Sequence, residues 1–571
     1  MGFLHFGTAL TWEETKKYAD HVRYHGITQF LNMWNNSKDR KNKFLWGDEV
    51  RGHISQVRVV SPQLTRYHHQ IEYSIISLDH NGKNAKVALK QTEILEKLGS
   101  LVEAISAGHP DRIPVASFHP EVGRQMVEST PGSPYTGSIA SLLSVEQNMR
   151  FRRALIRSQL ESNEFPITLT NFPRLGVPGA FTEPYFDPSG AVSSHSLFLP
   201  QELQNSHARF HALNGNTRIR RGAKVAVNLP LYPDKNVPHP FIDPTIPWDR
   251  AVYPEDSDAK NGAALPNHIY LDAMAFGGSC CCLQVTVQGH DVDQARRIYD
   301  AMVPLAPIMD IQSTNWQSVR LKPPPPNIDM GWRVEFRTME VQMTDFENAA
   351  FSIFMILLTR AVLAFDLNFY VPISKVDENM QRAQLRDACR SQSFFFRKSV
   401  FPPHQTSSTP AVQSDCSDCT NINRKEAKLQ NCFSALPRPL NVVYRGSTKD
   451  EYEEMSMREI MNGKGNYFPG LLNLINACID SLEVTEEERQ KIGKYLDFIK
   501  QRSNGSLQTP ATWLRNFIRS HPKYKFDSVV SQEINYDLVV AVDEIVEGIR
   551  RVSSLLPEDY NADVDEVIIE H

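Results

Sequence analysis

The feature that most constrains the fold is a set of segments in which apolar and polar side chains alternate along the chain. Alternation with period two is typical of a β-strand that has one face in the core. The clearest examples are residues 167–172, 224–229, 280–288 and 332–344. Helices do not separate these segments one by one, so strict βαβ alternation is absent. The pattern predicts an α+β fold with a mostly antiparallel sheet.

Turn signals and helical periodicity predict the remaining elements. Asn81-Gly82 lies between residues 72–79 and 86–89, which is typical of a β-hairpin. Apolar residues at helical spacing predict the main helices, at residues 92–106, 144–160, 291–302 and 345–365, and a mainly helical C-terminal part.

Two capping boxes mark helix starts. Thr11 with Glu14 opens a helix through about Arg23, which Gly26 is expected to end. Beyond Gly26, Ile27, Phe30, Leu31 and Trp34 again recur at helical spacing. Ser144 with Gln147 opens the helix at residues 144–160.

The most apolar run of the chain is residues 349–358. Ser352 interrupts this run and Thr359-Arg360 ends it, so it is shorter than the ~20 apolar residues that span a bilayer. We therefore expect a buried helix and no membrane partner.

Composition excludes several classes of protein. The chain has 571 residues, 41% hydrophobic and 22% charged, which suits a large globular enzyme. Its net charge of −5 and the absence of long blocks of like charge argue against nucleic acid and anionic membranes as partners. The N-terminus lacks a secretory pattern, and eight cysteines are too sparse for a disulfide scaffold. We expect a cytoplasmic protein with reduced thiols.

Three of these cysteines are consecutive. Alternation places Cys280 and Cys282 on the polar face of their strand, where they could line a cleft, and Cys281 on the apolar face. Small packing thiols are the simpler interpretation. A metal site is disfavoured because neighbouring residues of a strand point apart, and a disulfide between neighbours would be strained. Cys416 and Cys419 have C-x-x-C spacing but no second pair.

Charged residues on strands are the other candidates for chemistry. Arg333, Glu335 and Arg337 share one strand face and could serve a phosphate and a metal, or form an internally paired ladder. The phase slips after Thr338, which predicts a β-bulge. Isolated glutamates in strand contexts could bind Mg²⁺ at a nucleotide site, although most single glutamates are simply solvated. They are Glu49, Glu72, Glu121 and Glu128.

Ordered motifs across the chain carry a resemblance to a known family. They include FLWGDEV, PGSPYTG, RRGAKVAVNLP, CCLQVTVQ, IQSTNWQSVRLKPPPP and GWRVEFRTMEVQMTDFENAA. The chain resembles the catalytic subunit of eukaryotic glutamate–cysteine ligase (γ-glutamylcysteine synthetase). The resemblance implies that ATP phosphorylates the γ-carboxylate of L-glutamate and that the amine of L-cysteine attacks the acyl phosphate, the first step of glutathione biosynthesis. It also implies a sheet funnel, glutamine-synthetase-like and wrapped by helices, and a regulatory (modifier) subunit as a partner.

The resemblance also implies site residues. The implied Mg²⁺ ligands are Glu49, Glu72, Glu121, Glu128 and Glu335, of which Glu49 and Glu72 match a Glu-x-Glu pair. Arg337 is the implied catalytic arginine, facing the reacting phosphate or carboxylate. Cys280, Cys282 and Trp316 match positions that line the glutamate pocket.

The sequence departs from the family pattern in four places. An insert at residues 51–71 interrupts the Glu-x-Glu pair, Ala275 replaces a glycine, and Thr338 replaces a common proline. The largest departure is a family segment absent between Met309 and Asp310, which includes the arginine that holds the glutamate α-carboxylate. The alternative to an active ligase is therefore a non-catalytic splice form or relative that binds the regulatory subunit.

We expect three parts in the chain. Residues 1–400 form the catalytic sheet-funnel region, residues 401–432 a mobile loop rich in Ser, Thr and Pro, and residues 433–571 a mainly helical part of the same domain.

Overall fold

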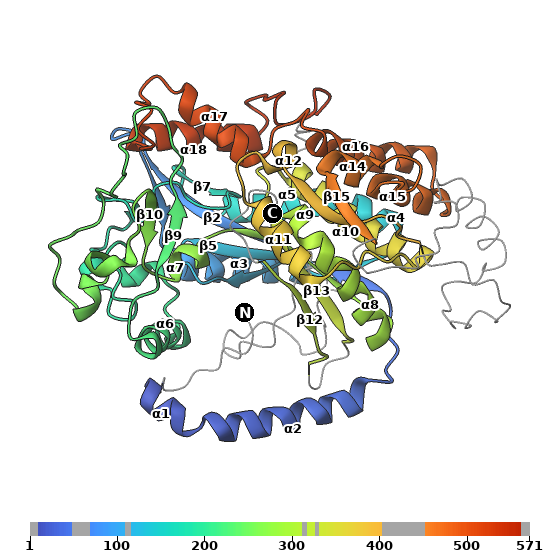
Figure 1. The fold of residues 1–571 in the computed structure, drawn as a ribbon, viewed down its shortest axis with the longest axis horizontal. Helices are drawn as coiled ribbons and strands as arrows, with labels where there is room; N and C mark the ends of the chain where they lie inside the picture. Colours follow the sequence, from blue (N-terminus) through green and yellow to red (C-terminus); the bar gives the residue numbers. More distant parts are fainter. Residues whose placement is uncertain are drawn as a thin grey trace.

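The computed structural model describes residues 10–47, 69–108, 116–310, 317–325, 330–401 and 451–560. It contains one large sheet, two small ones, and helices around them, which confirms the α+β class (Figure 1). Every strand pairing is antiparallel except that of β3 with β8.

The large sheet follows one main path with side branches. The path is β12 (Val319–Lys322), β13 (Arg333–Glu340), β11 (Cys282–Gln288), β2 (His69–Asp79), β3 (Asn84–Ala88) and β8 (Thr182–Glu183). The branches are β1 (Leu45–Gly47), β4 (Ala116–Pro120), β5 (Met126–Pro131), β6 (Tyr135–Thr136) and β7 (Glu164–Ile167). The small sheets pair β9 (Val227–Pro230) with β10 (His268–Leu271) and β14 (Ser393–Arg397) with β15 (Tyr452–Ser456).

The α-helices of the first half are α1 (Trp12–Lys17), α2 (Ala19–Ser37), α3 (Gln91–Gly108), α4 (Ile139–Leu143), α5 (Val145–Arg157), α6 (Ala208–Arg221) and α7 (Ala275–Gly278). Those of the second half are α8 (Val292–Met302), α9 (Ala306–Met309), α10 (Asp345–Phe365), α11 (Ile373–Ala383), α12 (Ala388–Ser391), α14 (Met457–Asn462), α15 (Leu471–Asp480), α16 (Glu486–Ser503), α17 (Pro510–Ser520) and α18 (Gln532–Val546).

Most of the predicted elements are present. The hairpin of β2 and β3 and the helices α3, α5, α8 and α10 are confirmed, and β11 and β13 are shorter versions of the predicted strands. Strand β9 overlaps only residues 227–229 of the strand predicted at residues 224–229. The strand predicted at residues 167–172 is wrong, because β7 ends at Ile167. The β-bulge predicted in β13 near Thr338 is confirmed, because the register of β13 against β11 shifts between Leu283 and Val285. The mainly helical C-terminal part is also confirmed within the described residues.

Two predictions of helix boundaries are also wrong. The Thr11 capping box starts α1, but this helix ends at Lys17 rather than near Arg23, and Gly26 lies inside α2, which continues to Ser37. A glycine in a helix costs only about 1 kcal/mol, which the surrounding helix formers can offset. Ser144 does not cap α5, because α4 runs directly into it and its hydroxyl donates to the carbonyl of Ser141 instead.

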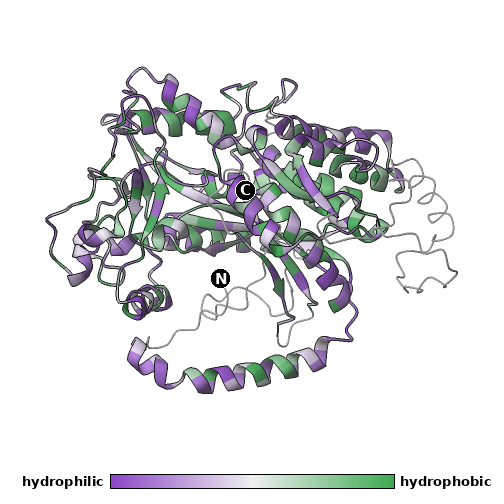
Figure 2. Cartoon of the chain, viewed as in Figure 1, coloured by the Kyte–Doolittle hydropathy of each residue, from purple (hydrophilic) through white to green (hydrophobic). Residues whose placement is uncertain are grey.

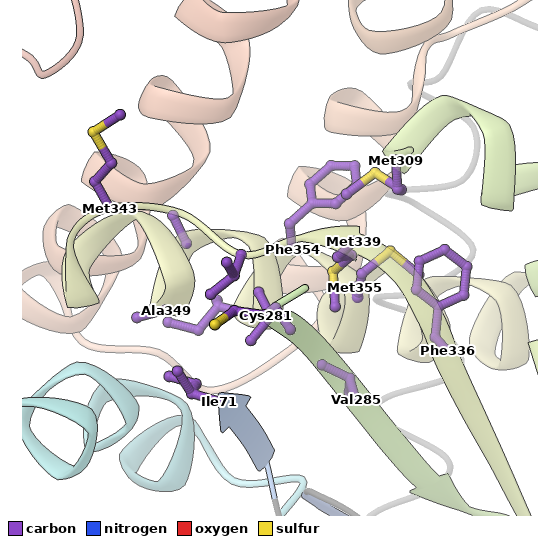
Figure 3. Close-up of a cluster of buried hydrophobic side chains, with 14 of the residues drawn as sticks. Ile71, Cys281, Val285, Met309, Phe336, Met339, Met343, Ala349, Phe354 and Met355 are labelled. Carbon is purple, nitrogen blue, oxygen red and sulfur yellow. The ribbon is translucent and has the colours of Figure 1, made fainter. Parts of the chain in front are cut away.

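Helix α10 is the centre of the core. A capping box of Thr344 and Glu347 starts it, and residues along almost its whole length are buried. It is the one helix in the described ranges that is long and apolar enough to cross a membrane, but 78% of its apolar window is buried inside the protein. The prediction of a buried helix is confirmed. Figure 3 shows Ala349 and Phe354 of α10 in one cluster of buried side chains with Cys281 and Val285.

The C-terminal helices share this core. Phe346 of α10 packs against Tyr495 and Phe498 of α16, with ring centroids 5.4 Å apart in both pairs. Helix α15 packs against α10 as well. The predicted loop at residues 401–432 lies outside the described residues, apart from Phe401.

Strands β1 and β2 lie on one line along β11. Gly47 pairs with Thr286, and His69 pairs with the next residue, Val285. Residues 48–68 stand between these two strand ends in the sequence and lie outside the described residues. The predicted insert boundary at residue 71 is therefore wrong: His69 to Ile71 belong to β2, because their backbone pairs with β11 and Ile71 is fully buried.

A buried ion pair fixes the start of α10 against α5. Arg153 donates from Nε and Nη2 to the two carboxylate oxygens of Asp345, both at 2.8 Å, and each side chain is 5% exposed. Such a pair contributes little net stability, but removal of one partner leaves a buried, unpaired charge.

We therefore predict that Asp345→Ala lowers the free energy of unfolding by roughly 3–5 kcal/mol, measured by urea titration. Asp20→Ala is the matched control, since Asp20 pairs with Arg23 on an exposed helix surface and its loss should have no measurable effect. Equal effects of the two substitutions would contradict this role of the buried pair.

Candidate active site

The strand registers place the candidate residues on one face of the large sheet. Ile71 pairs with Leu283, so the following Glu72 lies on the same face as Cys282. Thr286 pairs with Glu335, and side chains two residues apart share a face. One face thus carries Glu72, Cys282, Gln284, Thr286 and Glu335, while the opposite face packs against α10.

Three glutamates gather at one end of this face. Glu72 of β2 and Glu128 of β5 are directly opposite each other in the antiparallel pair, and Glu121 directly follows β4. Their exposed fractions are 4%, 0% and 7%. The structure therefore brings together three of the five predicted metal ligands in a place with little water.

Burial raises the pKa of Glu72 well above its ordinary value, and the charges of Glu121 and Glu128 raise it further. The backbone N–H of Cys282, which donates to Glu72 Oε2 at 3.0 Å, acts in the opposite direction. Mutual repulsion of buried carboxylates is relieved by a proton or by a cation between them.

The donor chemistry of this cluster fits Mg²⁺, which prefers carboxylate oxygens and leaves other positions to substrate phosphates and water. Within the described ranges, however, no three His, Cys, Asp or Glu side chains are already arranged to hold a metal ion. The three glutamates thus fit Mg²⁺ in type and proximity rather than as a preformed cage.

The fourth described glutamate, Glu335, lies among cations. Its carboxylate is 3.1 Å from Lys322 Nζ, 3.4 Å from Arg320 Nη1 and 3.6 Å from Arg337 Nε, and it is fully buried. Arg337 also donates to Gln284 Oε1 at 3.2 Å. These contacts correspond to the paired-ladder interpretation of this strand.

The sequence reasoning missed two of these cations. Arg320 and Lys322 lie on β12, directly opposite Glu335 and Arg333. Their alternation in SVRLK was a usable signal, but only the pairing of β12 with β13 shows that they face Glu335.

The cysteines are buried thiols. Burial raises the pKa values of Cys281 and Cys282, and the charge of Glu72 raises both further, so the thiols stay protonated. None of the five cysteines in the described residues forms a disulfide. Alternation predicted that Cys280 lies on the strand, and this prediction is wrong. Strand β11 begins at Cys282, and Cys280 lies in the turn after α7, where its backbone N–H donates to the carbonyl of Gly277.

Other predicted positions have different outcomes. Glu49 and Trp316 lie outside the described residues. By register, Gln70 occupies the strand position two residues before Glu72, opposite Gln284. Ala275 lies within α7 and is absent from the described residues with positive φ, so a side chain is tolerated there. Thr338 is buried and donates to the carbonyl of Ala306 at 3.1 Å.

A buried carboxylate beside Cys282 was not predicted. Glu340 pairs with Cys282 across β11 and β13, and burial raises its pKa to about 7. Thr170 Oγ1 donates to its carboxylate at 2.8 Å, which partly opposes that shift. No local pattern predicts this environment, because it depends on residues that are distant in the chain.

An antiparallel α+β scaffold with buried carboxylates and cations on one sheet face is suited to an enzyme that binds charged substrates. The sequence model of the glutamate–cysteine ligase family matches residues 2–65, 61–309 and 310–545. The chain belongs to the glutamate–cysteine ligase family, a family of ligases.

Individual relatives agree with this assignment. The glutamate–cysteine ligase of Schizosaccharomyces pombe is 34% identical over 723 aligned positions, covering 96% of this chain and 98% of the relative. The human glutamate–cysteine ligase catalytic subunit is 35% identical, covering 97% of each chain. The enzyme of Neurospora crassa is 35% identical, covering 96% of this chain and 92% of the relative.

The comparisons also show where the match to the family is interrupted. The family match breaks between Met309 and Asp310 although the chain is continuous there. The alignment with the S. pombe enzyme spans 723 positions, more than the 571 residues of this chain. The relatives therefore carry residues that have no counterpart here.

Glu340 generates a pH prediction. Its pKa is higher in the folded protein, about 7, than its ordinary value of 4.5, so the folded state holds a proton that the unfolded chain releases. The stabilisation is complete below about pH 4.5 and is lost as pH rises through 7. This titration should lower the unfolding free energy of the wild-type protein by on the order of 2 kcal/mol between pH 5 and 8. We predict that Glu340→Gln removes this fall.

Urea titrations at several pH values measure this slope. Glu487→Gln on the surface of α16 serves as the control and should keep the wild-type slope. An unchanged slope in Glu340→Gln would show that Glu340 does not titrate in this range.

Proposed function

We propose that this chain is built for ATP-dependent ligation of the γ-carboxyl group of L-glutamate to L-cysteine through an acyl phosphate. The observation that carries this proposal is the common sheet face that holds Glu72, Glu121 and Glu128 at one end and Arg337 with Glu335 at the other. Acyl phosphate formation from ATP relies on positioned charges that neutralise the transferred phosphoryl group.

The glutamates are proposed as Mg²⁺ ligands, with ATP bound beside them. When bound, Mg²⁺ would neutralise phosphate charge. The remaining steps fall to side chains: Arg337 would face the transferred phosphate or the glutamate carboxylate, and Cys280 and Cys282 would shape the glutamate pocket. Protonated, buried thiols are poor nucleophiles, which suits a reaction whose attacking group is the substrate amine.

Several finer features belong to the same proposal. The large sheet would form a glutamine-synthetase-like funnel, with residues 1–400 and 433–571 in one domain joined by the loop at 401–432. The protein would work in the cytoplasm with a regulatory subunit as partner. Shared burial of α10, α15 and α16 in one core supports the single domain.

A second candidate function is a non-catalytic form that binds the regulatory subunit. Two observations favour it. The family match is broken at Met309/Asp310, and the ion pairs of Glu335 with Lys322, Arg320 and Arg337 would compete with a metal or a substrate phosphate.

A γ-glutamylcysteine assay with ATP and Mg²⁺ tests the first proposal. If the chain turns over, we expect Glu72→Gln to lower kcat/KM roughly 10²-fold or more, because it removes one charge from the cluster. Glu487→Gln is the matched control, because Glu487 pairs with Lys491 on an exposed helix. Turnover that is insensitive to Glu72→Gln would overturn the proposed site.

Calorimetric titration of L-glutamate separates the two candidates. Binding at millimolar concentration or tighter supports the ligase proposal, since some group must then replace the missing arginine. Absence of both turnover and glutamate binding, in a chain that is folded, supports the non-catalytic form.

A further inference from the structure

Three arginines from two separate segments converge on the ring of Tyr232, which lies shortly after β9. The Cζ atoms of Arg515, Arg386 and Arg519 lie 3.9, 4.4 and 5.6 Å from the ring centroid. Arg515 and Arg519 are about one turn apart on α17, so they share a face of that helix. Arg386 lies in the connection between α11 and α12. Figure 2 shows both hydrophilic and hydrophobic residues along α17.

The tyrosine orients these cationic side chains. Guanidinium groups stack on aromatic rings, and Arg519 Nη1 also donates to the Tyr232 hydroxyl at 2.7 Å. The planar forks are thus held in place before a ligand binds. Side chains that are already oriented lose less conformational freedom on binding, which favours affinity.

The positive charge of this cluster exceeds the negative charge beside it. Arg519 Nη2 lies 3.5 Å from Asp234 Oδ1. Within the described part of the chain, neither Arg386 nor Arg515 forms an ion pair, and Asp387, the neighbour of Arg386, pairs with a different arginine. Three guanidinium groups and one carboxylate therefore leave two positive charges, which a dianion would neutralise.

One nitrogen of the cluster is buried without an acceptor. Arg515 Nη1 has no hydrogen-bond partner among the residues that the structure describes. Burial lowers the pKa of Arg515 below its ordinary value, and the charges of Arg386 and Arg519 lower it further, although Tyr232 acts in the opposite direction. A buried N–H without an acceptor and crowded like charges both cost free energy. An oxyanion would supply the acceptor and the opposite charge together.

We propose that Arg386, Arg515 and Arg519 form a binding site for a phosphate-class dianion, either free phosphate or the phosphate group of a small monoester. Arginine forks bind phosphate oxygens through paired hydrogen bonds, and three forks offer more donors than one carboxylate can accept. Helix α17 and the connection between α11 and α12 contribute no residue to the sheet face of the candidate active site. The proposal therefore does not depend on the ligase activity proposed above.

Calorimetric titration of the full chain tests this site. Inorganic phosphate and glycerol 3-phosphate serve as probes, without Mg²⁺ and at constant ionic strength. We expect saturable binding that Arg386→Gln weakens about tenfold or more, because one charged hydrogen-bonding fork is lost. Arg489→Gln is the matched control, since Arg489 pairs with Asp480 on a different helix surface and its loss should leave the affinity unchanged.

Arg337→Gln separates this site from the candidate active site. The binding expected here persists in Arg337→Gln and is lost in Arg386→Gln. The proposal is overturned if the folded wild-type chain binds neither probe, or if the only binding observed is lost in Arg337→Gln and kept in Arg386→Gln. Tighter binding of inorganic phosphate would assign the free ion as the ligand, and tighter binding of glycerol 3-phosphate a monoester; either supports the site.

Melting in phosphate-free buffer distinguishes a binding role from a structural one. Arg386 is exposed, and its replacement by Gln removes one of three like charges, so the melting temperature should stay the same or rise slightly. A fall of roughly 4 °C or more in Arg386→Gln, but not in Arg489→Gln, would show that Arg386 stabilises the fold without an anion and would refute the proposal.

Discussion

The burial of α10 against one face of the large sheet is the constraint on which the rest of the structure depends. Val285 of β11 and Phe336 of β13 pair across the strands and belong to the same buried cluster as Phe354 of the helix (Figure 3). Since successive side chains of a strand point to opposite faces, every strand that buries an apolar side chain there must send its next residue to the other face. This alternation therefore places the polar side chains of the candidate site together on the other face.

The charged face contains two contrasting electrostatic environments. At the β2 end, Glu72 is buried beside like charges, so the cluster gains from a cation. At the β12 end, the carboxylate of Glu335 is already surrounded by cations. The uncharged side chains of Gln284 and Thr286 lie between the two ends on β11. A substrate that carries Mg²⁺ and phosphate would have complementary groups at both ends.

The family match is interrupted at Met309/Asp310, but the strands that follow this point are paired within the large sheet. The flanking strands β12 and β13 keep their register, because β13 also pairs with β11 in the middle of the sheet. The pairing of β12, β13 and β11 therefore keeps the strands that follow the interrupted match in one sheet.

Local patterns determined much of this protein: the hairpin of β2 and β3, the polar and apolar faces of β11, the bulge in β13 and the full extent of α10 could all be predicted from the sequence. The glutamates at Glu72, Glu121 and Glu128 could be named, but not their proximity. Only the tertiary structure decided that His69 follows Gly47 along β11, that Lys322 reaches Glu335 and that Cys280 precedes its strand. The physical reason is range: periodicity and capping act within a few residues, whereas register, burial and ion pairing depend on strands that are distant in the chain.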